Sequence, residues 1–241
     1  MRLEGVVAGY GAITVLNGLS FTAPAGCVTT LIGANGAGKS TVFKTIFGLV
    51  RARAGTIHIG DDDVTGLTQR ALLARGVVYV PQGRNLFPTL SVRHNLELGG
   101  ITLGSRTLLN QRIDAVLARF PRIAERVDAQ ASTLSGGEQK QLEIGRALLL
   151  APRVMLIDEP SIGLAPKVIA EVFALLRALV ATGVTVLMVE QNGRSALAVS
   201  DHAVALEGGR TAIASPAAEM LQNPRIKSLF LGGHIATAAT A

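Results

Sequence analysis

The sequence has no tryptophan, a single cysteine and only 4% aromatic residues among its 241 positions. One cysteine, Cys27, can form neither a disulfide within the chain nor a structural zinc site alone, so we interpret it as a small core residue in a reducing compartment. No apolar run approaches the roughly 18–20 residues that a membrane-spanning helix needs. The first ten residues lack the charged and apolar segments of a secretory signal. We therefore expect neither export nor a membrane span.

Charged residues are also scarce, at 17%, whereas hydrophobic residues make up 49% and the mean hydropathy is +0.41. This composition excludes a disordered chain and predicts that part of the apolar surface meets a partner. The net charge of +6 suits nucleic acid, an anionic membrane surface or a phosphorylated ligand, and charge alone does not choose among them. The arginines between positions 51 and 126 are not interleaved with aromatic residues. We therefore favour a solvated basic flank over a nucleic-acid groove and expect no nucleic-acid partner.

The apolar runs and turn residues of the first part of the chain predict an α/β fold. Residues 3–7 and 15–21 are β-like runs separated by turn signals, which predicts an antiparallel start. Residues 27–32 form a β-branched apolar run that leads through a glycine-rich turn to a helical pattern over residues 41–49. This order predicts a strand, a loop and a helix.

Two later apolar runs, residues 154–157 and 184–189, lack alternation, so we expect strands buried on both faces. The helical pattern over residues 167–181 lies between them and predicts a crossover that makes the two strands parallel.

The middle third of the chain has helical patterns over residues 91–98, 105–127 and 138–150. We therefore predict one domain over residues 1–233, with a helical lobe of about residues 82–150 inserted into a core. The core would comprise residues 1–81 and 151–233. We expect a flexible tail over residues 234–241, which are small and weakly polar.

Residues 33–40 match the P-loop pattern, in which two glycines flank four residues and are followed by lysine and a hydroxyl residue. Glycines let successive amides turn toward phosphate oxygens, and the following helix adds its positive dipole end. Lys39 would then supply charge to the β- and γ-phosphates, and Ser40 would bind Mg²⁺. The alternative is a glycine-rich turn with an exposed lysine. The nucleotide-binding residues expected here are Gly33, Asn35, Gly36, Ala37, Gly38, Lys39, Ser40 and Thr41.

Two adjacent acids, Asp158 and Glu159, follow the apolar run 154–157. Ligands gather at the carboxyl ends of parallel strands, so we expect Asp158 to reach the Mg²⁺ shell beside the P-loop. Glu159 would point the other way in the pleat and polarise a water for attack on the γ-phosphate. The alternative is a solvated strand-to-loop turn.

Ser135 precedes a predicted helix, and Glu138 three residues later completes a capping-box pattern. Taken alone, this marks a helix start. The glycines Gly136 and Gly137 also leave amides bare at a positive helix end, which predicts a second anion site. A second phosphate site suggests that this segment serves a nucleotide held by another subunit.

Residues 33–40, 134–139 and 154–160, in this order, resemble the nucleotide-binding subunit of an ATP-binding cassette transporter, and the resemblance covers about residues 3–233. It implies a P-loop NTPase core with a mostly parallel sheet and flanking helices, an antiparallel β subdomain and the inserted α-helical lobe. It also implies ATP and Mg²⁺ as ligands, ATP hydrolysis, and closure of a head-to-tail dimer around two ATP molecules.

The resemblance assigns further roles. Tyr10 would stack on adenine, the alternative being a core tyrosine. Gln82 would touch Mg²⁺ or the attacking water and link the core to the lobe. Ser135 and Gly137 would contact the γ-phosphate of ATP bound mainly by the partner subunit.

Two positions depart from the family pattern. Gln191 stands where a histidine usually contacts the γ-phosphate; its amide can donate a hydrogen bond but carries no proton charge. Ala165 stands where an aspartate usually makes a cross-subunit contact. These departures allow the two ATP sites of a dimer to differ in hydrolysis.

Residues 33–39, 83–87, 144–148, 160–166, 189–192 and 229–233 together resemble the shorter ATPase of bacterial branched-chain amino-acid importers. This implies a second, different ATPase subunit, with a homodimer as the alternative for the isolated chain. It also implies two membrane permeases, an external solute-binding protein and a position on the cytoplasmic face of the inner membrane. Importers of urea or short amides use similar ATPases, so the solute stays open. Permease docking would use residues 82–90, whose apolar side chains could equally pack on their own lobe; these are Leu86, Phe87, Pro88 and Leu90.

Two other classes of function are weaker. A cassette ATPase acting on nucleic acid or ribosomes usually joins two cassettes, and this chain has room for one. A regulatory cassette without catalysis would lack the base, and Glu159 is present.

Overall fold

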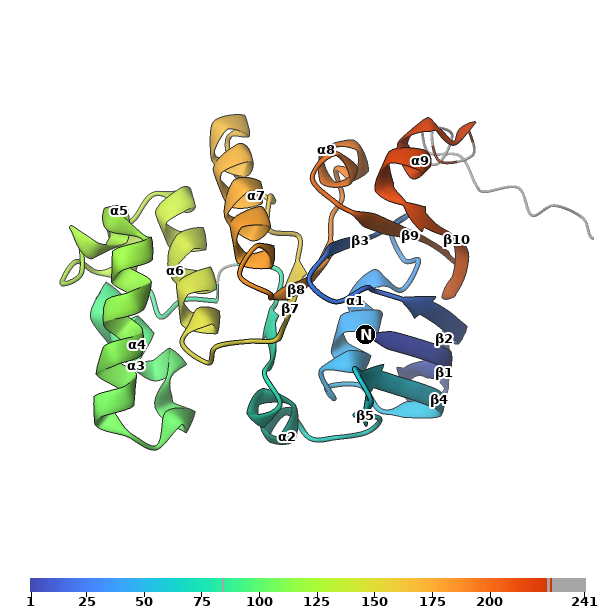
Figure 1. The fold of residues 1–241 in the computed structure, drawn as a ribbon, viewed down its shortest axis with the longest axis horizontal. Helices are drawn as coiled ribbons and strands as arrows, with labels where there is room; N and C mark the ends of the chain where they lie inside the picture. The colour runs from blue at the N-terminus through green and yellow to red at the C-terminus, as the bar shows by residue number, and fades with distance from the viewer. Residues whose placement is uncertain (84, 225, 227–241) are drawn as a thin grey trace, which may run out of the picture.

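The computed structural model describes residues 1–83, 85–224 and 226. The described residues form two β-sheets with helices between and beside them (Figure 1). The predicted tail, residues 234–241, lies outside the described residues. No helix among the described residues is long and apolar enough to cross a membrane.

The smaller sheet has the strand order β2-β1-β4-β5 and its pairs are antiparallel, as predicted for the start of the chain. Its strands are β1 (Arg2–Tyr10), β2 (Ile13–Thr22), β4 (Ala52–Ile59) and β5 (Asp62–Asp63).

The larger sheet has the order β10-β9-β3-β8-β7-β6. All its pairs are parallel except β9 with β10. Its strands are β3 (Val28–Gly33), β6 (Val77–Val80), β7 (Val154–Asp158), β8 (Thr185–Val189), β9 (His202–Glu207) and β10 (Arg210–Pro216). Cys27, predicted as a core residue, is only half buried just before β3.

The larger sheet is covered on both faces at β7 and β8, which explains why these two strands have no alternation. Every residue of these two strands is buried. Leu156 packs on the side of helix α1 (Lys39–Ile46) and the smaller sheet, whereas Met155 and Ile157 pack on the side of α7 (Pro166–Val180). Neighbouring residues of a strand point to opposite faces, so a doubly covered strand must be apolar throughout. The predicted α/β core is confirmed.

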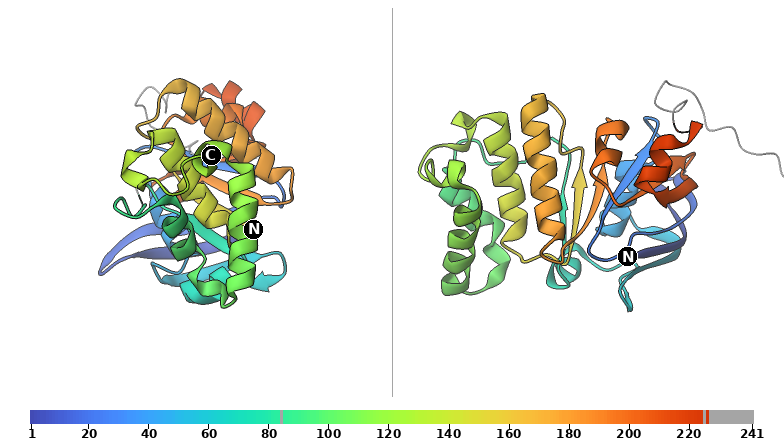
Figure 2. Two further views of the ribbon diagram at one scale, coloured as in Figure 1. Left: turned by 90° about the vertical axis from the view of Figure 1, so that its left-hand side faces the viewer. Right: turned by 45° about the horizontal axis from the view of Figure 1, so that its top comes forward.

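The remaining helices complete the fold. Three of them lie in the part of the chain that carries the two sheets: α2 (Gln69–Ala74), α8 (Gly193–Ala198) and α9 (Ala217–Gln222). The others lie between β6 and β7, namely α3 (Val92–Gly99), α4 (Arg106–Arg119), α5 (Pro121–Ala124), α6 (Gly136–Leu148) and the short 3₁₀ turns Ile101–Leu103 and Ala131–Thr133. In Figures 1 and 2, α6 (yellow-green) stands between α7 (orange) and the green helices α3 and α4.

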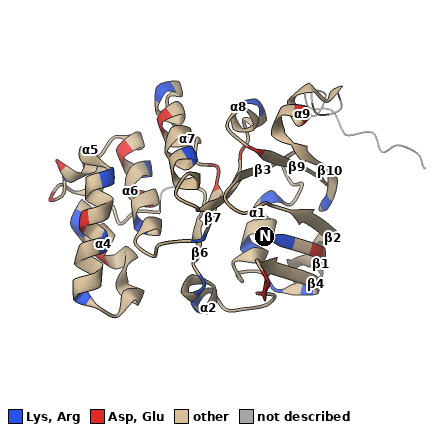
Figure 3. Cartoon of the chain, viewed as in Figure 1, with Lys and Arg blue, Asp and Glu red and all other residues tan. Residues whose placement is uncertain are grey.

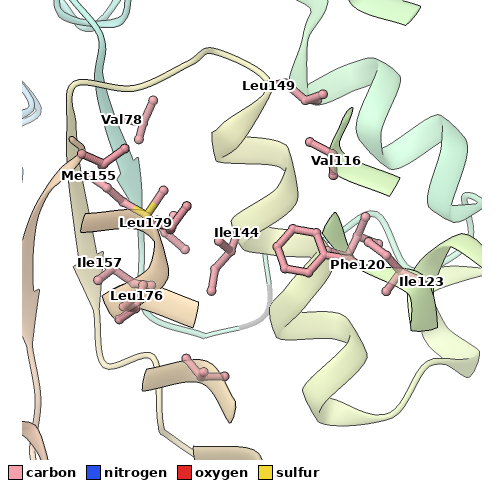
Figure 4. Packing of buried hydrophobic residues seen from close by; sticks show 14 of the residues in the cluster. Val78, Val116, Phe120, Ile123, Ile144, Leu149, Met155, Ile157, Leu176 and Leu179 are labelled. Carbon is pink, nitrogen blue, oxygen red and sulfur yellow. The ribbon is translucent and has the colours of Figure 1, made fainter. Parts of the chain in front are cut away.

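One expected helix is wrong in its extent, because residues 105–127 are divided into α4 and α5. Phe120 ends α4 with φ −124° and ψ 74°, and Pro121 begins α5. Proline disfavours helical conformation at the preceding residue and lacks the amide hydrogen that would continue α4. The side chain of Phe120 uses this bend to enter the core, where Figure 4 shows it facing Ile144 of α6.

A single apolar cluster joins the helices between β6 and β7 to the larger sheet. Ile144 lies between Phe120 on one side and Ile157 and Leu176 on the other (Figure 4). Gly145 permits this packing, because an added Cβ there would lie 2.8 Å from Cγ1 of Val116. The division into a core and a lobe at residues 82–150 stays a prediction.

Candidate nucleotide-binding site

The loop between β3 and α1 has the geometry of an anion cradle. Gly36 and Gly38 adopt φ 82° and 100°, values that glycine tolerates and L side chains rarely adopt. Gly38 is also the N-cap of α1 and provides no side-chain cap. The N-cap residue therefore offers no side-chain acceptor to the first amides of α1. A helix start with free amides and a positive dipole end favours binding of a phosphate.

Lys39 folds back over this loop. Its Nζ donates to the carbonyl oxygens of Gly33 at 2.7 Å and Ala34 at 3.0 Å, and the residue is only 8% exposed. Burial lowers the pKa of the Lys39 ammonium, while the charges of Glu159 and Asp158 act in the opposite direction. The structure thus brings Lys39 close to both predicted acids.

Asp158 ends β7 beside the P-loop and is 2% exposed. Its Oδ2 accepts a hydrogen bond from the Tyr79 hydroxyl at 3.3 Å, and its Oδ1 is buried without a partner among the described residues. Burial raises the pKa of Asp158, and the nearby hydroxyls of Ser40 and Tyr79, with the charges of Lys44 and Lys39, offset part of this rise. An unpartnered carboxylate oxygen beside a serine hydroxyl fits the oxygen ligands that Mg²⁺ prefers.

Glu159 lies in a turn after β7, whereas the prediction treated it as continuing the pleat of the strand. It lies one residue beyond β7 with φ 48°, in the left-handed region, and its amide donates to the carbonyl oxygen of Val189 at 2.9 Å. Its Oε2 accepts a hydrogen bond from Nε2 of Gln82 at 2.7 Å. The structure therefore brings Gln82 and Glu159 together, although they are far apart in the sequence.

Glu190 is a feature of this region that the sequence reasoning missed. It directly follows β8 and is 2% exposed. Its side chain accepts two hydrogen bonds from Ser161, one from the backbone amide at 2.8 Å and one from the hydroxyl at 2.7 Å. Burial raises the pKa of Glu190, and the bonds from Ser161 offset part of this rise. The sequence contains a signal for Glu190, because an acidic residue follows the apolar run 184–189 just as Asp158 follows the run 154–157. Gln191, the next residue, is exposed.

Tyr10 lies at the end of β1 and is 46% exposed, so the alternative of a core tyrosine is wrong. Nζ of Lys44 in α1 lies 6.0 Å from the centre of its ring. The following turn is held by Arg53, which donates to the carbonyl oxygen of Gly11 at 2.7 Å and to Oγ1 of Thr14 at 3.2 Å. Tyr10 thus presents an aromatic ring near the P-loop helix.

The segment from Ser135 forms the predicted capping box. The amide of Ser135 donates to Oε2 of Glu138 at 2.7 Å, and the amide of Glu138 donates to Oγ of Ser135 at 3.4 Å. An added Cβ at Gly137 would lie 2.7 Å from Cγ1 of Val168, so this glycine also lets α6 pack on α7. Among the described residues, the hydrogen bonds of Ser135 stay within its own segment. The chain therefore does not bring Ser135 into hydrogen-bonding contact with its own P-loop.

The loop after β6 is bound to α6 beside a cavity of about 290 Å³. Asn85 donates its amide to Oε1 of Glu143 at 2.9 Å, and its carbonyl oxygen accepts a bond from Arg146 at 2.5 Å. The Arg146 guanidinium also lies 5.2 Å from the centre of the Phe87 ring, which is 45% exposed. Leu86, in contrast, packs on the core. The apolar residues of 82–90 are thus divided between the surface and the core.

Charges of both signs are interspersed over helices α4 to α7 (Figure 3). The interpretation of the arginines between positions 51 and 126 as a solvated basic flank stays a prediction.

Comparison with known proteins agrees with this geometry. The ABC transporter family model matches residues 16–162. The high-affinity branched-chain amino acid transport ATP-binding protein BraG of Pseudomonas aeruginosa is 42% identical over 233 residues, covering 97% of this chain and 100% of that protein. The probable branched-chain amino acid transport ATP-binding protein LivF of Archaeoglobus fulgidus is 34% identical, covering 96% of this chain and 98% of that protein.

A crystal structure of an ATP-binding cassette of an ABC transporter in its ADP conformation superimposes with a TM-score of 0.87 and 28% identity, covering 96% of this chain and 98% of that one. The family match includes the P-loop, the segment at Ser135, and the acids Asp158 and Glu159. The chain therefore belongs to the ABC transporter family, as one of its nucleotide-binding, ATP-hydrolysing subunits.

Proposed function

We propose that this chain powers a bacterial importer of branched-chain amino acids, by ATP-driven closure of an ATPase dimer against membrane permeases. The observation that carries the ATPase is the cluster of Lys39, Asp158, Glu159 and Gln82 at the P-loop. Support for the transported solute comes from BraG, which is 42% identical over its whole length.

In this proposal the P-loop binds the phosphate tail of ATP. The amides at the start of α1 donate to phosphate oxygens, and Lys39 exchanges the carbonyl oxygens of Gly33 and Ala34 for the β- and γ-phosphates. Tyr10 stacks on adenine, for which its exposed ring is available. The expected phosphate-binding residues are those of the sequence prediction, Gly33, Asn35, Gly36, Ala37, Gly38, Lys39, Ser40 and Thr41.

Ser40, Asp158 and Gln82 would hold Mg²⁺, which when bound neutralises charge that develops on the phosphate oxygens. The unpartnered Oδ1 of Asp158 supports this assignment. The remaining catalytic work falls to Glu159, which accepts a proton from the attacking water. Gln82 donates to Oε2 of Glu159 and so leaves Oε1 free for that water. Gln191 would donate a hydrogen bond near the γ-phosphate without exchanging a proton.

The site would be completed by a second subunit. Ser135, Gly136 and Gly137 lie at the start of α6, where the positive end of the helix dipole favours an anion, and would contact the γ-phosphate of ATP held by the partner. Ala165 would provide no carboxylate for a cross-subunit contact. The expected assembly contains a second, different ATPase, two permeases and an external solute-binding protein, on the cytoplasmic face of the inner membrane.

The test is ATP hydrolysis by the transporter complex reconstituted in liposomes from this chain and the subunits encoded beside it. Leucine, isoleucine or valine with the solute-binding protein should stimulate turnover. Stimulation by urea or acetamide alone would refute the assigned solute. Glu159→Gln should bind ATP and turn over slowly, whereas Lys39→Ala should lose ATP binding; normal turnover in the first or normal affinity in the second would contradict the assigned role.

A further inference from the structure

Glu190 is a buried carboxylate that the proposed catalytic cycle does not use. Each of its two oxygens accepts a hydrogen bond from Ser161, Oε1 from the amide at 2.8 Å and Oε2 from the hydroxyl at 2.7 Å. Within the described part of the chain, no ion pair is formed by Glu190. Burying a carboxylate without a cation is unfavourable, and hydrogen bonds to the charged form offset the cost. The unfavourable burial of this carboxylate suggests that its hydrogen bonds have a specific role.

The two hydrogen bonds join the loops that follow β7 and β8. The main chain joins the same loops one step earlier, because the amide of Glu159 donates to the carbonyl oxygen of Val189 at 2.9 Å. Glu159 is therefore held on both sides, by its own amide and by Ser161 two residues later. Between them stands Pro160, whose ring fixes φ and transmits the position of Ser161 back to Glu159.

The conformation of Glu159 explains why such a restraint is needed. Its φ of 48° lies in the left-handed region, which is disfavoured for a residue with a side chain. A following proline further restricts the backbone of the residue before it. A disfavoured conformation persists only where the surrounding structure over-determines it, and such conformations cluster at functional sites.

We propose that Glu190 and Ser161 form a clamp that holds Glu159 in the position from which it accepts a proton from the attacking water. This inference rests on the proposed function, in which Glu159 accepts the proton of the attacking water. Glu190 is a positioning residue here, because it acts through the backbone of residues 159–161 and not on the substrate. Loss of the clamp should lower kcat and leave nucleotide binding unchanged, since the P-loop lies on other elements.

The test uses the complete chain in its transporter complex, with kcat and KM for ATP and the Kd for a non-hydrolysable ATP analogue. Glu190→Ala should lower kcat about tenfold or more, in the range expected for a small displacement of a catalytic group, and change KM and Kd by less than about twofold. Glu190→Gln should retain more activity, because a rotated Ser161 hydroxyl can accept from the new amide. Ser161→Ala should add nothing to Glu190→Ala.

Two controls separate positioning from general destabilisation. Thr182→Ala removes a hydroxyl that donates to the carbonyl oxygen of Leu179 at 2.7 Å, before β8 and away from the site, and should keep the wild-type kcat. In the Glu159→Gln background, Glu190→Ala should reduce the residual rate no further.

Wild-type kcat in both Glu190 variants would overturn the clamp while leaving the proposed function standing. An additional loss from Glu190→Ala in the Glu159→Gln background would also overturn it, because the effect would not pass through Glu159. Normal turnover by Glu159→Gln alone would overturn the proposed role of Glu159 and the clamp with it.

Discussion

Replacing Lys140 by methionine should destabilise this protein strongly, because it would leave a charge buried in α6. Nζ of Lys140 lies 2.6 Å from Oε2 of Glu143, and the two side chains are only 7% and 4% exposed. The other oxygen of Glu143 accepts the amide of Asn85 at 2.9 Å. After Lys140→Met, Glu143 would retain this one donor and lose its counter-ion.

Breaking a buried pair by removing one partner costs about 3–5 kcal/mol. We expect the lower end, about 3 kcal/mol, since the Asn85 amide still stabilises the carboxylate. For a chain of this length, each kcal/mol lowers Tm by about 2–4 °C, so the loss in Tm should be roughly 6–12 °C. Adding Glu143→Gln to Lys140→Met removes the stranded charge, keeps the contact to Asn85 and should restore most of the stability.

The free energy of unfolding and Tm are measured for the nucleotide-free wild type, both single variants and the double variant. The matched control is Arg106→Met, which removes an exposed pair with Glu97 whose side chains are 72% and 24% exposed. It should cost no more than about 0.5 kcal/mol. A loss below about 1 kcal/mol for Lys140→Met, or a double variant no more stable than it, would refute the reasoning.

Three further predictions follow from the same structure. Gly137→Ala should destabilise the chain by about 1–2 kcal/mol through the clash with Val168, and Val168→Ala should relieve it; unfolding measurements that show no coupling would count against the clash. Burial raises the pKa of Asp158, so its ionisation destabilises the nucleotide-free fold as pH rises from about 4 through that raised value. Asp158→Asn should therefore be more stable than wild type at pH 7–8, with a difference that closes toward pH 4 in thermal unfolding; an equal difference at both pH values would contradict this sign. Arg53→Ala should raise KM for ATP a few-fold at unchanged kcat, as Tyr10→Ala should, because Arg53 holds the turn after Tyr10; an unchanged KM would remove that link.

The parts of the fold that were predictable are those set by local pattern. The spacing of the glycines and lysine in residues 33–40 predicted a loop between a strand and a helix, and the structure has this order. The apolar runs of β7 and β8 likewise predicted strands that are buried on both faces. The capping box at Ser135 is equally local, since both of its hydrogen bonds lie within four residues of chain. Such features depend on neighbours in sequence.

What could not be predicted depends on which strands become neighbours in space. Ser161 and Glu190 meet only because β7 and β8 pair in parallel, with Asp158 opposite Val189. The left-handed turn at Glu159 is stabilised across the same pair, so the pleat of β7 does not extend to this residue. The contact of Gln82 with Glu159 likewise requires β6 to lie beside β7.

The same stretch of chain that carries Glu159 also supports the segment proposed to reach the partner's ATP. An added Cβ at Gly136 would lie 3.2 Å from Leu164, and one at Gly137 would lie 2.7 Å from Val168, so both glycines rest against residues that follow Glu159 closely in sequence. Close-packed contacts of this kind transmit displacement and do not absorb it. A shift of the glycine segment on dimer closure would therefore move the residues that hold Glu159. We expect ATP contact at one site of the dimer and hydrolysis at the other to be energetically coupled through residues 160–168.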